Sequence, residues 1–135
     1  MEELIPKNKG DVKTAKKLKN YSYEEVKNII PELLSWIQDM NWPVALPVSE
    51  FLQSISEYLT NDIIKILQGN DDVWKYWCVS VFGLNAIKPI DTRLIAEFKR
   101  IAINPTETEI TEEIHKLILE FLEVEKAAKR DNNPF

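Results

Sequence analysis

The chain has 135 residues, of which 44% are hydrophobic, and this suits a single domain over residues 1–135 with a buried core. It contains three glycines and no long run in which polar and apolar residues alternate, which argues against a β-rich fold. The net charge of −5 argues against a nucleic-acid partner, because proteins that bind nucleic acids usually carry a basic face.

The charge is unevenly distributed along the chain. Residues 1–20 carry six lysines and three acidic residues, a net charge of +3, so the remaining residues carry −8. A solvated first helix explains these lysines, and a docking role is the alternative. Cys78 is the single cysteine, which excludes an internal disulfide and indicates a small buried side chain. No apolar run reaches the ~18 residues of a membrane span, so we expect a cytoplasmic protein without a membrane partner.

The first part of the chain predicts two helices. Residues 1–10 are expected to form a flexible arm, and Asp11 is suited to cap the first helix. Ser22 and Glu25 have capping-box spacing and should begin the second helix, in which Pro31 is expected to cause a kink but not a break. The apolar residues of the second helix recur every three or four positions: Val26, Ile29, Ile30, Leu33, Leu34 and Ile37.

Two further helices are predicted in the middle of the chain. Asn41 is suited to cap the third helix, and Pro47 should bend it or delay its start. Thr60 or Asn61 should begin the fourth helix, which should end near Gly69. The expected buried residues of these helices are Val44, Val48, Phe51, Leu52, Ile55, Ile63, Ile64, Ile66 and Leu67.

Three helices are predicted in the remaining chain. Asp71 or Asp72 should cap the fifth helix, and Asp91 should cap the sixth. Thr106 and Glu109 have capping-box spacing and should begin the last helix. The expected buried residues are Val73, Trp77, Cys78, Val81 and Phe82, then Leu94, Ile95, Phe98 and Ile101, then Ile110, Ile114, Leu117, Ile118, Phe121 and Leu122.

One pattern recurs after about 30 residues. Residues 33–44 contain the end of an apolar helix, an acidic turn and the start of another helix, and residues 63–74 repeat this order, so that Ile37 aligns with Leu67. Because periods of 20–50 residues indicate stacked units, the sequence predicts an all-α fold, a short α-solenoid of about seven antiparallel helices. A closed helical bundle without a repeat is the alternative. Residues 129–135 should form a flexible tail.

The turn of the first repeat resembles that of HEAT repeats. The order helix, Asp-x-Asn-Trp-x-Val, helix, with a proline inside the first helix, is carried by Pro31, Asp39, Trp42 and Val44. Ala45 stands where HEAT repeats commonly have an arginine. The resemblance implies that the solenoid is HEAT-like.

Two longer runs, residues 36–45 and 71–77, resemble a small uncharacterised bacterial family of domains of unknown function. The resemblance covers nearly the whole chain. It implies the same helical fold and a bacterial, cytoplasmic setting, and it points to no catalytic residues.

Few residues suggest metal or nucleotide chemistry. His115 is the sole histidine and follows Glu112 by three positions, the spacing of half a di-metal carboxylate site, but no second such pair exists. Asp39 opens a possible calcium loop, in which Pro43 occupies a ligand position. No glycine-rich phosphate loop is present. We therefore expect no metal, no cofactor and no catalytic residues.

Acidic turn residues and nearby tryptophans form the first candidate binding site. If the turns line up, Asp39, Trp42, Asp71, Asp72 and Trp74 would form an acidic and aromatic edge. The alternative is that the aspartates cap helices and the tryptophans seal the contacts between helices.

A second candidate surface consists of apolar residues that point away from the expected buried faces. On ideal helices these are Leu46, Tyr76 and Val79, which could form an exposed strip beside Lys75. Burial by a neighbouring helix is the alternative.

The expected function is that of a non-catalytic module that binds another protein, because helical solenoids present extended surfaces. One alternative is an acidic immunity- or antitoxin-type inhibitor of a basic partner, since opposite charges favour association. Another is an enzyme with a shallow site of Asp and Trp side chains on a helical-repeat scaffold.

Overall fold

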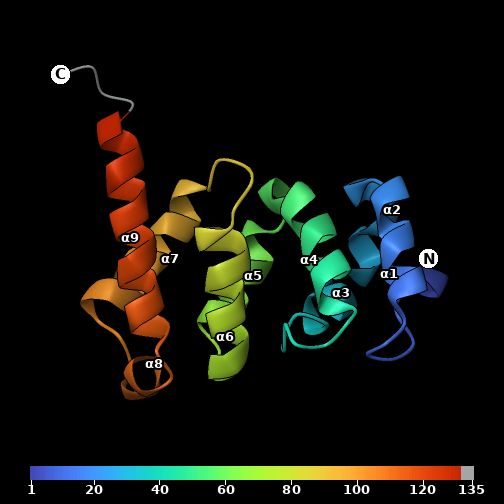
Figure 1. The fold of residues 1–135 in the computed structure, drawn as a ribbon, viewed down its shortest axis with the longest axis horizontal. Helices are drawn as coiled ribbons and strands as arrows, with labels where there is room; N and C mark the ends of the chain where they lie inside the picture. Colours follow the sequence, from blue (N-terminus) through green and yellow to red (C-terminus); the bar gives the residue numbers. More distant parts are fainter. Residues whose placement is uncertain (132–135) are drawn as a thin grey trace.

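The computed structural model describes residues 1–131, and the side chains of residues 1–128. All regular secondary structure in this part of the chain is helical, which confirms the all-α class. The elements follow one another along the long axis, from α1 (Val12–Lys17) and α2 (Tyr23–Val26) at one end to α9 (Ile114–Asp131) at the other (Figure 1). None of the described helices combines the length and the apolar character that crossing a membrane requires.

The N-terminal residues pack against the body, whereas the sequence predicts a flexible arm. Leu4 lies in a short 3₁₀ turn and is only 2% exposed, within the core. The carbonyl of Lys9 accepts a hydrogen bond of 3.0 Å from the N–H of Val44. Asp11 caps α1 as predicted, because its carboxylate accepts a bond from the N–H of Thr14. Burial of Leu4 and the bond between Lys9 and Val44 hold the N-terminal segment against the body.

The predicted second helix is interrupted. The capping box of Ser22 and Glu25 begins α2 as expected, but a 3₁₀ turn follows at Lys27–Ile29 before α3 (Ile30–Ser35) begins. Pro31 therefore lies in the first turn of α3, where a residue needs no N–H donor, and the predicted kink inside a continuous helix is wrong. The predicted buried face is confirmed in full.

Asn41 does not cap the third predicted helix. Its N–H bonds to the Asp39 carboxylate at 2.9 Å within a turn, and α4 (Ala45–Ser54) begins only after Val44. The start is delayed as Pro47 predicts, because Pro47 then falls in the first turn and not in the helix interior.

The next three helices begin where the sequence predicts. They are α5 (Thr60–Leu67), α6 (Asp72–Val79) and α7 (Thr92–Ile103). The carboxylates of Asp71 and Asp91 accept bonds from the N–H groups of Trp74 and Arg93, so both aspartates are N-caps. Each cap satisfies a backbone donor that the helix leaves unpaired.

A π-helix, Ser80–Leu84, continues α6. The Gln53 side chain on α4 donates hydrogen bonds of 2.9 Å to the carbonyls of Val81 and Asn85, which fastens this wider turn to α4. A Cβ at Gly83 would lie 3.4 Å from ring atoms of Phe98, so glycine allows the π-helix to approach α7 closely.

The predicted last helix is split in two. Thr106 and Glu109 form the expected capping box at the start of α8 (Glu107–Thr111). The chain then turns at Glu113, whose φ of 65° is left-handed, before α9 begins. α9 runs to Asp131, so the expected tail 129–135 starts within a helix, and residues 132–135 lie outside the described part.

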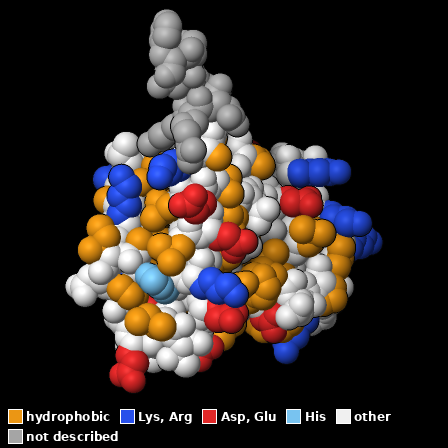
Figure 2. Space-filling view, turned by 60° about the vertical axis from the view of Figure 1, so that its left-hand side comes forward, with side chains coloured by type: hydrophobic (Ala, Val, Ile, Leu, Met, Phe, Trp, Pro, Cys, Tyr) orange, Lys and Arg blue, Asp and Glu red, His pale blue; other side chains and the backbone are white. Residues whose placement is uncertain are grey.

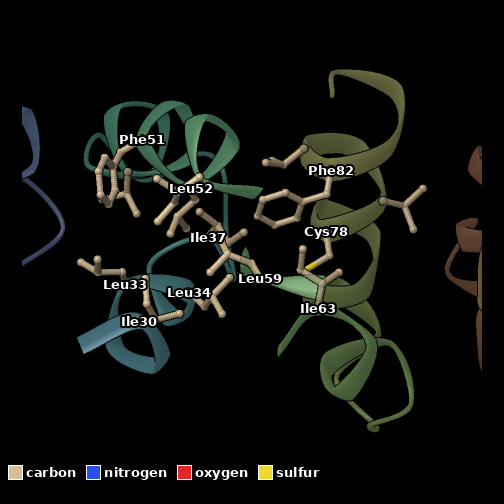
Figure 3. Close-up of a cluster of buried hydrophobic side chains, with 14 of the residues drawn as sticks. Ile30, Leu33, Leu34, Ile37, Phe51, Leu52, Leu59, Ile63, Cys78 and Phe82 are labelled. Atoms are coloured by element: carbon tan, nitrogen blue, oxygen red, sulfur yellow. The ribbon is translucent and has the colours of Figure 1, made fainter. Parts of the chain in front are cut away.

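The helices enclose one continuous hydrophobic core. Figure 3 shows side chains from α3, α4 and the α6 segment pointing toward one another, among them Leu34, Leu52 and Phe82. Val73 and Ile110 are exposed, at 52% and 57%, and Trp77 and Ile95 are half-buried outside the core, so the sequence-based assignment of these four to the core is wrong.

Two leucines of α4 should distinguish core from surface. Leu52→Ala should lower the free energy of unfolding by about 2–5 kcal/mol, because Leu52 is fully buried and its loss leaves a cavity. Leu46→Ala, at a position that is 58% exposed, should change it by less than about 0.5 kcal/mol. Urea denaturation of both variants measures the difference, and equal effects would contradict the assigned face.

Replacing the left-handed residue between α8 and α9 by glycine should stabilise the protein. Glu113→Gly should raise stability by about 0.5–1 kcal/mol, because glycine adopts a positive φ without the steric cost of a Cβ. Glu112→Gly is the matched control: its φ of −88° is allowed for any residue, so glycine there should not raise the stability. Thermal unfolding of the two variants tests the backbone conformation.

Candidate binding groove and the buried ion network

An apolar groove lies between α3 and the turn that joins α5 to α6. Its volume is about 330 Å³. Pro31 and Leu34 line it from α3, and Ile66 and Trp74 line it from α5 and α6. The rest of the lining is mostly polar: Asp62, Lys65, Gly69, Asn70 and Asp71.

Trp74 is fixed in this groove by two hydrogen bonds. Its indole N–H donates to the carbonyl of Leu34 at 3.1 Å, and its backbone N–H donates to Asp71 Oδ1 at 3.1 Å. Because the single polar group of the indole is satisfied, the half-buried ring offers the groove only an apolar surface.

A buried ion network lies on the other side of the same turn. Lys75 is 4% exposed and its Nζ lies 3.1 Å from Oε2 of Glu109, which is fully buried. Arg100 holds both carboxylate oxygens of Glu109, at 2.6 and 3.0 Å. The backbone N–H of Thr106 donates a further bond of 2.8 Å to Oε1. One carboxylate therefore joins α6, α7 and α8.

These bonds lower the pKa of Glu109. Burial alone would raise it, because the charged form loses hydration. The hydrogen bonds from Arg100, the Thr106 N–H and Lys75 outweigh that effect and bring the pKa from 4.5 to about 2. Glu109 therefore stays ionised at neutral pH and pairs with two cations.

Asp72 and Glu97 extend the network toward solvent. Asp72 Oδ1 lies 3.5 Å from Lys75 Nζ and forms no hydrogen bond within the described chain, and Glu97 pairs with Arg100 at 2.9 Å. A polar hollow of about 560 Å³ opens beside these groups. Gly69 and Asn70 line both this hollow and the apolar groove, so the α5–α6 turn separates the two.

The predicted acidic and aromatic edge forms only in part. The α3–α4 connection and the start of α6 lie at the same edge of the molecule in Figure 1. Asp71 and Trp74 share the groove, and Asp72 belongs to the ion network. Trp42 packs edge-on against Trp36, with ring centroids 5.8 Å apart, and Lys9 lies over its ring. Trp42 thus seals the N-terminal segment, and its neighbour Asp39 only closes a turn.

The predicted apolar strip does not exist. Leu46 is exposed and Tyr76 is half-buried against Trp77, but Val79 is fully buried. α6 is rotated relative to the expectation, because Lys75, Cys78 and Val79 form its inner face, which Phe82 continues in the π-helix. Burial also raises the pKa of the Cys78 thiol, which keeps it protonated, as expected for a buried cysteine.

The sequence interpretation placed Lys75 beside an exposed strip, which is wrong because it is 4% exposed; it did not single out Arg100, and it saw Glu109 only as a capping residue. A signal for Lys75 was available, because it lies three and seven positions before Cys78 and Phe82, on the same helix face. His115, by contrast, has a structural contact: its Nε2 lies 3.0 Å from the Ala102 carbonyl and joins α9 to α7. Among the side chains of residues 1–128, no three His, Cys, Asp or Glu cluster in a way that could hold a metal ion.

The surface around α9 carries charges of both signs. Figure 2 shows Lys, Arg, Asp and Glu side chains interspersed with hydrophobic ones on this face, without a broad area of one sign. Ile103 is the most exposed large apolar residue of the described chain, at 84%.

The fold and the groove define an all-helical protein with an apolar, Trp-lined surface site. Residues 4–122 match the family model described as a domain of unknown function (DUF5071), and the chain belongs to this family. The sequence has no significant match among proteins whose function has been curated.

Removing the shared carboxylate should destabilise the protein strongly. Glu109→Gln should cost about 3–5 kcal/mol, because it removes the charge that Lys75 and Arg100 share and leaves the buried Lys75 ammonium with only Asp72, 3.5 Å away, as an ionic partner. Glu57→Gln is the control: the Glu57 side chain is 43% exposed and pairs with Lys88. Its loss should cost less than about 1 kcal/mol. Urea denaturation compares the two, and a small effect at Glu109 would contradict a strong network.

The same carboxylate should make stability depend on pH. Its pKa is lower in the folded state, so its contribution is complete above about pH 4.5 and is lost as the pH falls toward 2. The difference in melting temperature between the wild type and Glu109→Gln should therefore shrink over this range. Comparing the two proteins cancels the titration of other carboxyl groups, and a constant difference would contradict the low pKa.

Proposed function

We propose that this chain is a non-catalytic protein-binding module whose partner occupies the groove beside Trp74. We further propose a HEAT-like α-solenoid architecture and a bacterial, cytoplasmic setting, as the sequence resemblance implies.

Burial repeats at the 30-residue spacing, which supports the solenoid. Ile37 and Leu67 are both fully buried, and so are Val48 and Cys78. The contacts also stay within a few elements along the chain: α4 packs on α1 and α3, and α9 packs on α6 and α7. Together with the open row of helices in Figure 1, these contacts favour stacked units over a closed bundle.

The observation that carries the binding role is the composition of the groove. Its floor is apolar, with the Trp74 ring oriented by its hydrogen bond to the Leu34 carbonyl, while its rim is charged. An apolar centre with a polar rim is the usual anatomy of a protein interface. The enzyme alternative is less well supported, because Asp71 Oδ1 and the indole N–H are both committed to structural bonds.

The groove can be tested by affinity capture with matched variants. Ile66→Ser changes a half-buried lining residue, and Val73→Ser changes an exposed residue of α6 outside the groove. Partners captured from cells of the source organism should be lost with Ile66→Ser and kept with Val73→Ser, with both variants folded by circular dichroism. Equal capture by the two variants would contradict a binding role for the groove.

A further inference from the structure

The rim of the groove carries charges that the chain itself does not pair. Asp62 and Lys65 lie three positions apart on α5, yet neither forms an ion pair with any residue among 1–128, and neither does Asp71. Asp71 uses Oδ1 as the α6 cap, which leaves Oδ2 free at the rim. The groove therefore offers two carboxylates against one ammonium group.

We propose that the groove takes one large apolar side chain of a separate partner protein, flanked in the partner's sequence by Lys or Arg. This inference rests on the function proposed above and names the chemistry of the partner. The apolar residue lies on Ile66 and Trp74, and the flanking cation meets Asp62 or Asp71.

The size and the charge of the groove both favour this occupant. About 330 Å³ is near the lower end of the range of roughly 300–1,000 Å³ for small-ligand sites, which suits one anchoring side chain better than a whole helix. The chain beyond residue 20 carries a net charge of −8, so a basic segment is steered toward it and an acidic one is repelled.

The test uses the whole purified chain and a phage-displayed library of random peptides. Peptides should be selected that combine a large apolar residue with a nearby Lys or Arg. The strongest is then synthesised, and its affinity is measured by Trp fluorescence against wild type and variants at low and high salt. Ile66→Ser should abolish the binding.

Charge-neutral variants test the cation. Asn caps a helix as well as Asp does, so Asp71→Asn removes the charge and keeps the α6 cap. Asp62→Asn/Asp71→Asn should weaken peptide binding by about two- to fivefold, the effect of losing one exposed ion pair, and should reduce its salt dependence. Asp39→Asn, whose carboxylate closes a turn outside the groove, should leave the affinity unchanged.

The outcomes separate the inference from the proposed function. Two results would overturn the inference but not the proposed binding groove. In one, the peptides depend on Ile66 but carry no basic residue; in the other, they bind the double variant as tightly as the wild type. Selection that yields no Ile66-dependent peptide overturns both. Ile87 is 65% exposed beside Lys88, so a second copy could also supply the motif. A dimer in sedimentation that Ile87→Ser and Ile66→Ser each dissolve would replace the separate partner by a second copy, and so overturn the proposal.

Discussion

The carboxylate of Glu109 is the point on which the C-terminal half of the structure depends. It accepts bonds from Lys75 on α6, Arg100 on α7 and the backbone of Thr106, so three elements meet at two oxygen atoms. A buried charge pair stabilises little compared with well-packed apolar groups, but an unpaired buried charge is very costly. The network therefore constrains how the helices pack: α6, α7 and α8 must all be in these positions for the buried charges to be paired.

This condition explains the two irregular features around it. α6 turns Lys75 inward, so Val79 follows it into the core and Val73 is left at the surface. α8 has to bring Glu109 to the same point, while the next buried residue, Ile114, belongs to a helix with a different direction. A left-handed residue at Glu113 makes that change of direction possible.

Much of the fold could be predicted because local rules decided it. The caps at Asp11, Asp71 and Asp91 and both capping boxes need only neighbouring residues, and they are where the sequence predicts. The buried faces of α3 and α4 follow from apolar periodicity alone. The buried face of α6 could not be predicted in the same way. The periodicity rule assumes that a lysine is exposed, whereas Lys75 is buried with a partner 34 residues away.

The candidate site could be predicted only in part, because local patterns identify single residues but not the contacts between distant helices. Asp71 and Trp74 stand out from the sequence by type and by position at a turn, and they do line the groove. Their neighbours Pro31 and Leu34 come from another helix, which no local pattern connects to them. The 30-residue register offers one further clue: the counterpart of Lys75 is Ala45, a fully buried residue, so the position itself is an interior one.

The long reach of the Lys75–Glu109 contact has a consequence for the order of synthesis. The lysine leaves the ribosome 34 residues before Glu109 does, and until then its only carboxylate partner in the network is Asp72, 3.5 Å away and not hydrogen-bonded to it. The ion pairing of the central helices is therefore complete only when α8 has been made. A chain cut short before residue 109 would never complete the network, so full stability of the central helices requires the synthesis of α8.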